Sequence, residues 1–286
     1  MLLENGTGLE IPMDMQLKDS NRFAITGFSL LILCSAVGNI YVLISIIRRN
    51  KGKISRINLL LLHLTIANLL VTFLMMPLEI VWNYTVSWLA GDFMCRLMSF
   101  FRAFGHYLTG FVIVVISLDL YFAVVKPFAI AYADRRAKIM LAAAWIASII
   151  CSFPQSIEKL ECYEQCLPIN FFPSEMYKVA YDAFFLFFLH LFPLSMVIFC
   201  YSCILYQAIK FRSMWSSKSS NDEITVTIVT AFFICWSPYT ICRLGIRRMI
   251  DSKSAQSVDG RIQAIMFVCT NSVFNPLIYG LFPECK

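Results

Sequence analysis

The sequence predicts an all-α membrane protein, a seven-transmembrane helix bundle, and three observations support this prediction. Hydrophobic residues make up 59% of the 286 residues and charged residues only 15%, whereas soluble domains carry about 25% charged residues. The apolar residues gather in seven long runs, each reaching or approaching the roughly 20 residues that a helix needs to cross a bilayer. The runs are continuous and do not alternate with polar residues, which argues against a transmembrane barrel.

The seven runs divide the chain into a membrane domain and two short tails. The runs cover residues 24–47, 57–82, 97–125, 137–156, 179–208, 224–247 and 262–281. We expect an extracellular tail over 1–23, a membrane domain over 24–281 and a short cytoplasmic tail over 282–286. The first tail lacks a basic leader followed by an apolar core and a cleavage site, so we expect no removable signal peptide.

Basic residues between the runs predict how the bundle is oriented. The loop after the first run, RRNKGKISR, carries five basic residues and no acid. By the positive-inside rule this loop is cytoplasmic and the N-terminus lies outside a plasma membrane. The net charge of +6 is therefore a topology signal, and we expect no nucleic-acid partner. Asn5 and Asn83 begin glycosylation sequons, and both fall on the predicted outer face.

Three of the eleven cysteines lie on the predicted outer side, where disulfides persist. Cys95 opens the third run, and Cys162 and Cys166 precede the fifth. A bridge from Cys95 to that loop would tie the loop over the mouth of the bundle. We favour Cys166 as the partner, but the sequence leaves Cys162 open.

Polar residues inside the apolar runs are the candidate functional groups, because they cost free energy in lipid. Arg102, His106 and Thr109 recur at helical spacing and form one polar stripe, and Glu79 lies near the outer end of the second run. Arg102 suits a ligand's oxygen atoms, but an internal pair with Glu79 satisfies both charges without a ligand. His106 is either a hydrogen-bonded interior residue or a ligand contact.

Five short motifs lie in order in five of the runs. They are Gly38-Asn39, Ala67-Asn68, Asp119-Leu120-Tyr121, Cys235-Trp236-Ser237-Pro238 and Asn275-Pro276-Leu277-Ile278-Tyr279. Together they resemble the motifs of rhodopsin-like (class A) G protein-coupled receptors. More narrowly, the stretches 76–95 and 165–175 and the PLIYG ending are similar to the receptors for gonadotropin-releasing hormone and insect adipokinetic hormone.

The resemblance implies an extracellular peptide hormone, an amidated neuropeptide, as the ligand. In the gonadotropin-releasing hormone receptors, the positions matching Glu79, Asn83 and Arg102 contact a peptide whose ends are a pyroglutamate and an amide. The full set of expected ligand-binding residues is Glu79, Trp82, Asn83, Arg102, His106, Trp236 and Tyr239. Because Asn83 also begins a sequon, a glycan and a ligand contact compete as explanations for it.

The resemblance also implies signalling through a heterotrimeric G protein, usually of the Gq type. The expected activation-switch residues are Asn39, Asn68, Asp119, Tyr121, Tyr201, Trp236, Pro238, Asn275, Pro276 and Tyr279. Leu120 departs from the family, which has an arginine there that restrains the closed state and then meets the G protein. An alternative is therefore a signalling-impaired decoy or dimer partner. Asn68 and Asn275 are both neutral, which disfavours an interior sodium site.

Other function classes fit the sequence less well. An amine receptor needs an acid in the third run where Arg102 lies, and an opsin needs a lysine in the seventh run, which has none. A transporter or channel is disfavoured because no inverted repeat or ion-lined pore is visible. Hydrolase motifs and paired metal ligands are absent, so we expect no enzyme, no metal and no cofactor.

Overall fold

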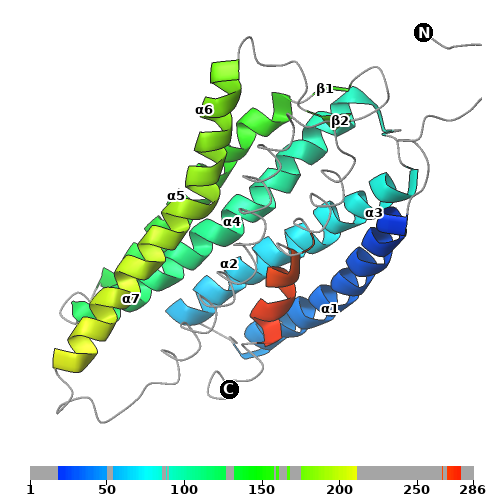
Figure 1. The fold of residues 1–286 in the computed structure, drawn as a ribbon. Helices are drawn as coiled ribbons and strands as arrows, with labels where there is room; N and C mark the ends of the chain where they lie inside the picture. Colours follow the sequence, from blue (N-terminus) through cyan, green and yellow to red (C-terminus); the bar gives the residue numbers. More distant parts are fainter. Residues whose placement is uncertain are drawn as a thin grey trace, which may run out of the picture.

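The computed structural model describes residues 19–49, 54–85, 88, 90–126, 132–157, 159–160, 166–167, 175–210, 266 and 269–277. Long helices dominate these ranges and run side by side, as Figure 1 shows. In chain order the elements are α1 (Asp19–Arg49), α2 (Arg56–Leu70), η2 (Val71–Met75), α3 (Met76–Thr85), α4 (Gly91–Val125), α5 (Ala133–Ser152), η4 (Phe153–Ile157), β1 (Lys159–Leu160), β2 (Cys166–Leu167), α6 (Glu175–Leu186), η5 (Phe187–Leu191) and α7 (Phe192–Lys210). A further helix over residues 269–277, red in Figure 1, lies beside α1.

Five helical spans among the described residues are long and apolar enough to cross a membrane. They cover Asp19–Arg48, Arg56–Thr85, Gly91–Val125, Ala133–Gln155 and Val179–Gln207. These spans coincide with the first five predicted runs, although the first helix begins inside the tail expected over 1–23. The predicted run 224–247 lies outside the described residues, and the run 262–281 is helical where it is described.

Two of the spans change helical pitch just before a proline. The π-helical turn η2 ends two residues before Pro77, and the π-helical turn η5 ends two residues before Pro193. A proline has no backbone N–H and crowds the preceding turn, and a wider turn relieves that crowding. At these two prolines the helix therefore contains a local π-turn and continues as one span.

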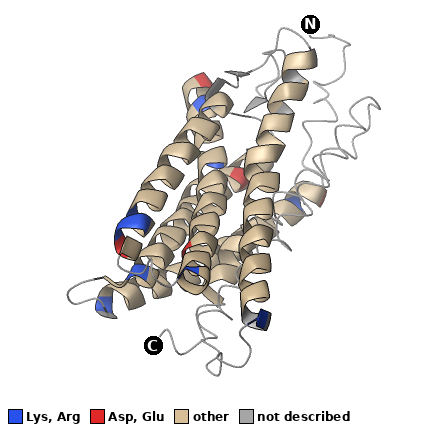
Figure 2. Ribbon diagram, turned by 90° about the vertical axis from the view of Figure 1, so that its left-hand side faces the viewer, with Lys and Arg blue, Asp and Glu red and all other residues tan. Residues whose placement is uncertain are grey.

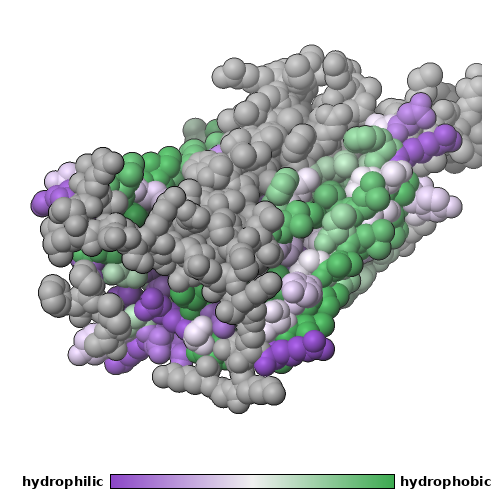
Figure 3. Space-filling view, turned by 90° about the horizontal axis from the view of Figure 1, so that it is seen from below, coloured by the Kyte–Doolittle hydropathy of each residue, from purple (hydrophilic) through white to green (hydrophobic). Residues whose placement is uncertain are grey.

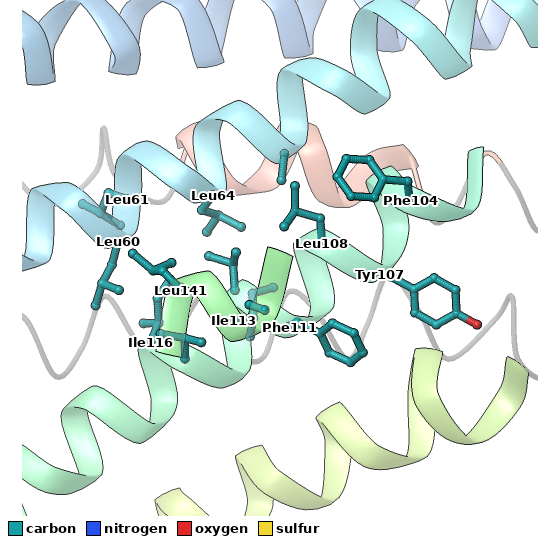
Figure 4. Close-up of a cluster of buried hydrophobic side chains, with 14 of the residues drawn as sticks. Leu60, Leu61, Leu64, Phe104, Tyr107, Leu108, Phe111, Ile113, Ile116 and Leu141 are labelled. Carbon is teal, nitrogen blue, oxygen red and sulfur yellow. The ribbon is translucent and has the colours of Figure 1, made fainter. Parts of the chain in front are cut away.

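The helix α4 is the centre of the bundle. It contacts α2, α5 and α7, and it contributes more buried residues to the main apolar core than any other described helix. Figure 4 shows this core, to which Leu64 of α2, Leu108 of α4 and Leu141 of α5 all contribute. Lipid is as apolar as leucine, so close van der Waals packing stabilises these contacts more than exclusion of water does.

The outer surface of the bundle is apolar along its length. Large side chains such as Leu33 and Ile146 have 63% and 58% of their surface exposed. Figure 2 shows Lys, Arg, Asp and Glu mostly near the helix ends, and Figure 3 shows hydrophobic residues along the flanks. This distribution is expected of a protein whose sides face lipid.

A short hairpin lies at one end of the bundle, close to the start of α4. The strands β1 and β2 pair antiparallel, with Leu160 opposite Cys166, and β1 contacts α4. The helix α4 begins at Gly91, whose φ of 77° lies in the left-handed region that glycine adopts without strain. We call this part of the molecule, which contains Cys95 and the hairpin, the hairpin end.

Candidate functional site

Glu79 of α3 and Arg102 of α4 form an ion pair below the hairpin end. Arg102 Nη2 lies 2.8 Å from Glu79 Oε1. The side chain of Glu79 is 6% exposed and that of Arg102 is 22% exposed, so both charges are largely withdrawn from the surface. The sequence allowed two interpretations of Arg102, a ligand contact and an internal pair with Glu79. The structure shows the internal pair.

An aromatic side chain of α3 also contacts Arg102. The guanidinium carbon lies 5.0 Å from the ring centroid of Trp82, within the range of a cation–π interaction. Trp82 packs edge-to-face on Trp88, whose indole N–H donates to the carbonyl oxygen of Gly91 at 2.9 Å. These contacts hold the segment between α3 and α4 close to the guanidinium of Arg102.

Asn83 is buried in α3, one turn beyond Glu79. Its Nδ2 donates to the backbone oxygen of Glu79 at 2.7 Å, and its own backbone oxygen accepts from Asn21 Nδ2 of α1 at 3.1 Å. A glycan on Asn83 would require this amide to leave its hydrogen bond and its buried position. The geometry therefore favours a role for Asn83 inside the bundle over glycosylation.

The remaining members of the polar stripe lie deeper along α4. His106 is half-buried, and its Nδ1 lies 2.6 Å from the carbonyl oxygen of Arg102 one turn earlier. Thr109 is buried and donates to the carbonyl oxygen of Gly105 at 2.9 Å. Both side chains thus hydrogen-bond to their own helix, in agreement with the interior reading of His106.

Cys95 is fully buried at the hairpin end and is disulfide-bonded. The expected partner, Cys166, lies in β2, but its side chain is outside the described part of the structure. Trp236, Pro238, Tyr239, Tyr279 and the sequon residue Asn5 also fall outside the described residues. Their expected roles remain predictions.

A second polar cluster joins α1, the α2 span and the helix over 269–277. Asn68 Nδ2 donates to Asn39 Oδ1 at 3.1 Å, and Asn275 Nδ2 lies 3.3 Å from Asn68 Oδ1. Asn39 Nδ2 also donates to the backbone oxygen of Ser272 at 2.8 Å. Three of the predicted switch residues thus form one network of neutral amides.

Sequence reasoning missed three hydroxyl groups of this network, those of Ser35, Thr72 and Ser272. The oxygen of Ser35 lies 2.6 Å from that of Thr72 and 3.1 Å from that of Ser272. Pro276 packs close to the same region, because a Cβ atom added to Gly38 would lie 2.7 Å from its Cγ. The motif residues Gly38 and Pro276 therefore mark a close approach of two helices.

The far end of α4 carries an ion pair that the sequence analysis did not anticipate. Asp119 Oδ2 lies 3.0 Å from Nε of Arg56, the first residue of α2, with side chains 6% and 22% exposed. Leu120 is half-buried beside Asp119, and the ring of Tyr121 packs 5.8 Å from that of Phe199 on α7. Asp119 therefore has a cation from a neighbouring helix, although the adjacent position holds leucine.

Comparisons with known proteins agree with this arrangement. A family model described as "7 transmembrane receptor (rhodopsin family)" matches residues 38–279. The gonadotropin-releasing hormone receptor of Rattus norvegicus is 33% identical over 294 residues, which cover 92% of this chain and 89% of that receptor. The corresponding receptor of Sus scrofa is 32% identical over 263 residues, with 82% and 80% covered. The gonadotropin-releasing hormone II receptor of Clarias gariepinus is 32% identical over 290 residues, with 91% and 76% covered.

The matched range covers most of the chain and includes all five motifs. It confirms the predicted all-α, seven-helix fold class, and members of this family are membrane receptors that couple to G proteins and are not enzymes. The chain belongs to the rhodopsin family of seven-transmembrane receptors and is related within it to the gonadotropin-releasing hormone receptors.

Proposed function

We propose that this chain is a cell-surface receptor for an amidated neuropeptide of the gonadotropin-releasing hormone or adipokinetic hormone type. Its N-terminus lies outside the cell, and it signals through a heterotrimeric G protein of the Gq class. The observation that carries the proposal is the buried Glu79–Arg102 pair next to Trp82 and Asn83. Charges inside a membrane span are costly, and those that occur there usually serve a function.

The chemistry of these side chains suits a peptide whose ends are neutral amides. A guanidinium has five N–H donors, more than one carboxylate occupies, so Arg102 can hold Glu79 and also donate to a ligand carbonyl. The Nδ2 of Asn83 is already used, and its Oδ1 makes no hydrogen bond within the described residues, so it can accept from a ligand N–H. Trp82 offers an aromatic face to a ring of the peptide.

A binding panel tests the ligand class. Cells displaying the chain are incubated with labelled amidated peptides of both hormone types and with the same peptides ending in a free carboxylate. We expect saturable binding of at least one amidated peptide. The Arg102→Gln variant should bind it roughly 10- to 100-fold more weakly, because a hydrogen bond to a charged group is lost. If well-displayed receptor binds no peptide of either type, the proposal is wrong.

The orientation is tested separately. An epitope tag at the N-terminus should be stained by antibody on intact cells, and a tag at the C-terminus only after permeabilisation. If the C-terminal tag were stained on intact cells and the N-terminal tag only after permeabilisation, the proposed orientation would be refuted. The fold assignment would not be affected.

Leu120 favours a second candidate function, a receptor that binds peptide but signals poorly. Calcium release in cells expressing the natural chain or the Leu120→Arg variant separates the two possibilities. Peptide-dependent calcium release by the natural chain supports the signalling receptor. Release that occurs only with Leu120→Arg supports the decoy or dimer partner.

A further inference from the structure

The first turn of α1 is joined to the last turn of α3 by a hydrogen bond. Asn21, the third residue of α1, is half-buried, and its Nδ2 donates to the backbone oxygen of Asn83 at 3.1 Å. Asn21 lies on the same face of α1 as Ala24 and Phe28, which are fully buried in one apolar cluster with Met76 of α3. The packing of this cluster therefore fixes the face of α1 that carries Asn21 against α3.

This hydrogen bond supplies a donor that the last turn of α3 needs. Asn83 is the third residue from the end of α3, and the last four carbonyl oxygens of a helix have no partner inside that helix. A basic side chain in the last turn can satisfy such carbonyl oxygens, but the last turn of α3 has none. Asn21 donates from a neighbouring helix instead, and it stabilises a turn of the kind that frays readily.

The turn that Asn21 stabilises contains all the residues of α3 that are expected to bind the ligand. Glu79, Trp82 and Asn83 lie within five residues, little more than one helical turn. Asn83 Nδ2 donates to the backbone oxygen of Glu79 at 2.7 Å, and Glu79 Oε1 lies 2.8 Å from Arg102 Nη2. One line of polar contacts thus runs from Asn21 on α1 through α3 to Arg102 on α4.

We propose that Asn21 is a positioning residue of the ligand site. It holds the last turn of α3 so that Asn83 keeps its Oδ1 available to the peptide, and it does not itself contact the ligand. The inference rests on the proposed function, since it assumes that a peptide binds beside Asn83. It gives α1 a part in ligand recognition, although Asn21 lies outside the apolar runs and belongs to none of the motifs.

A double-mutant cycle tests whether Asn21 acts through Asn83. Saturation binding on membranes is measured for the natural chain, Asn21→Leu, Asn83→Ala and the double variant, with the labelled amidated peptide of the panel above that binds the natural chain most tightly. Leucine has nearly the shape of asparagine but no N–H to donate. We expect Asn21→Leu to weaken binding about three- to tenfold in the natural chain, the effect of one hydrogen bond. In the Asn83→Ala receptor it should weaken binding less than about twofold, because the side chain that it positions is gone.

The matched control is Thr26→Ala in the same helix. Thr26 is exposed, and its hydroxyl donates to the carbonyl oxygen of Arg22 at 3.0 Å, within α1. This change should alter peptide affinity less than about twofold. Saturation binding reports the affinity of the folded receptors, so a lower yield of a variant does not affect the comparison. Equal losses from Asn21→Leu with and without the Asn83 side chain would overturn the proposal, because Asn21 would then act independently of Asn83.

A second measurement needs no peptide. Amide hydrogen exchange of the empty, detergent-purified receptor is followed by mass spectrometry. Asn21→Leu should raise the exchange rate in the last turn of α3 about threefold or more and leave that of α5 unchanged, whereas Thr26→Ala should change neither. Unchanged exchange in α3 would overturn the proposal. If the natural chain binds no peptide of either hormone type, the proposed function fails, and the exchange rates alone decide whether Asn21 holds α3.

Discussion

Exchanging the two charges of the Glu79–Arg102 pair separates a structural role from a role in ligand binding. The variants are Glu79→Gln, Arg102→Gln and the exchange Glu79→Arg with Arg102→Glu. Each single change leaves one charge of the pair, 2.8 Å from its former partner, largely buried and uncompensated. The exchange keeps both charges and the attraction between them but reverses their positions.

The expected cost follows from the burial of the pair. Removing one partner of a buried ion pair costs about 3–5 kcal/mol, and the 22% exposure of Arg102 places this pair at the lower end of that range, near 3 kcal/mol. A loss of that size lowers the midpoint of thermal unfolding by roughly 6–12 °C. The exchange should recover more than half of the loss in the empty receptor.

Peptide binding should respond differently. In the exchanged receptor the acid lies where the ligand's carbonyl oxygens are expected, so peptide affinity should remain at least tenfold reduced although the fold is restored. The midpoint is measured on detergent-purified receptor, and the affinity by competition on membranes. If the exchange restores both quantities, the pair is only structural and the reasoning about the ligand is refuted. If it restores neither, the ion pair is not what stabilises this layer.

Three other contacts between helices give further predictions. Arg56→Gln should lower the midpoint of thermal unfolding. In a receptor that already carries Asp119→Asn, Arg56→Gln should lower it less, because the partner of Arg56 is then neutral. Equal losses in the two receptors would show that the 3.0 Å contact contributes nothing. Gly38→Ala should destabilise the folded receptor by about 1–3 kcal/mol and lower its yield, because the added Cβ would lie 2.7 Å from Pro276 Cγ. The control Val37→Ala, at a position that is 71% exposed, should express normally. Asn68→Asp should destabilise the receptor by about 1–3 kcal/mol, because an ionised carboxylate has no hydrogen to donate to Asn39 Oδ1. An unchanged midpoint of thermal unfolding would contradict that hydrogen bond.

The sequence predicted the described spans well because lipid imposes a simple rule on them. Each span needs a continuous apolar stretch, and the predicted run 57–82 lies inside the observed Arg56–Thr85. The helix ends were less predictable. The helix α4 begins at Gly91, six residues before its apolar run. The left-handed glycine lets the chain turn into the helix, and the ion pair between Arg96 and Asp92 at 2.7 Å supports its first turns outside the hydrocarbon.

Contacts between helices were predictable only where two opposite charges lay at the same depth in the membrane and needed a partner. Arg102 and Glu79 are two opposite charges in the outer half of the membrane, so the sequence allowed an ion pair between them to be predicted. A lone serine or threonine in an apolar helix usually bonds to its own backbone, as Thr72 does with the carbonyl oxygen of Asn68 at 2.7 Å. That Thr72 also meets Ser35 depends on how the two helices are rotated, which tertiary packing decides.

The pair of Arg56 with Asp119 changes how the missing arginine at position 120 is understood. Asp119 is followed by leucine, so the sequence places no cation beside its carboxylate on the same helix turn. Arg56 supplies that cation from the start of α2, so the burial of Asp119 in this structure does not need an arginine at 120. An introduced Leu120→Arg side chain would compete with Arg56 for one carboxylate.

The two ion pairs bind α4 to the span Arg56–Thr85 at both ends, with opposite polarity. On α4 the cation Arg102 and the anion Asp119 are about 25 Å apart along the helix axis. A ligand that draws Arg102 away from Glu79 weakens the contact at the hairpin end, while Asp119 and Arg56 still hold the other end. We therefore expect α4 to move against α2 mainly at the hairpin end in the natural chain. Breaking the pair of Arg56 with Asp119 should extend that movement to the opposite end. If the receptor signals, Arg56→Gln should therefore raise G protein activation in the absence of ligand. If Leu120 prevents coupling to the G protein, Arg56→Gln should leave that activation at background.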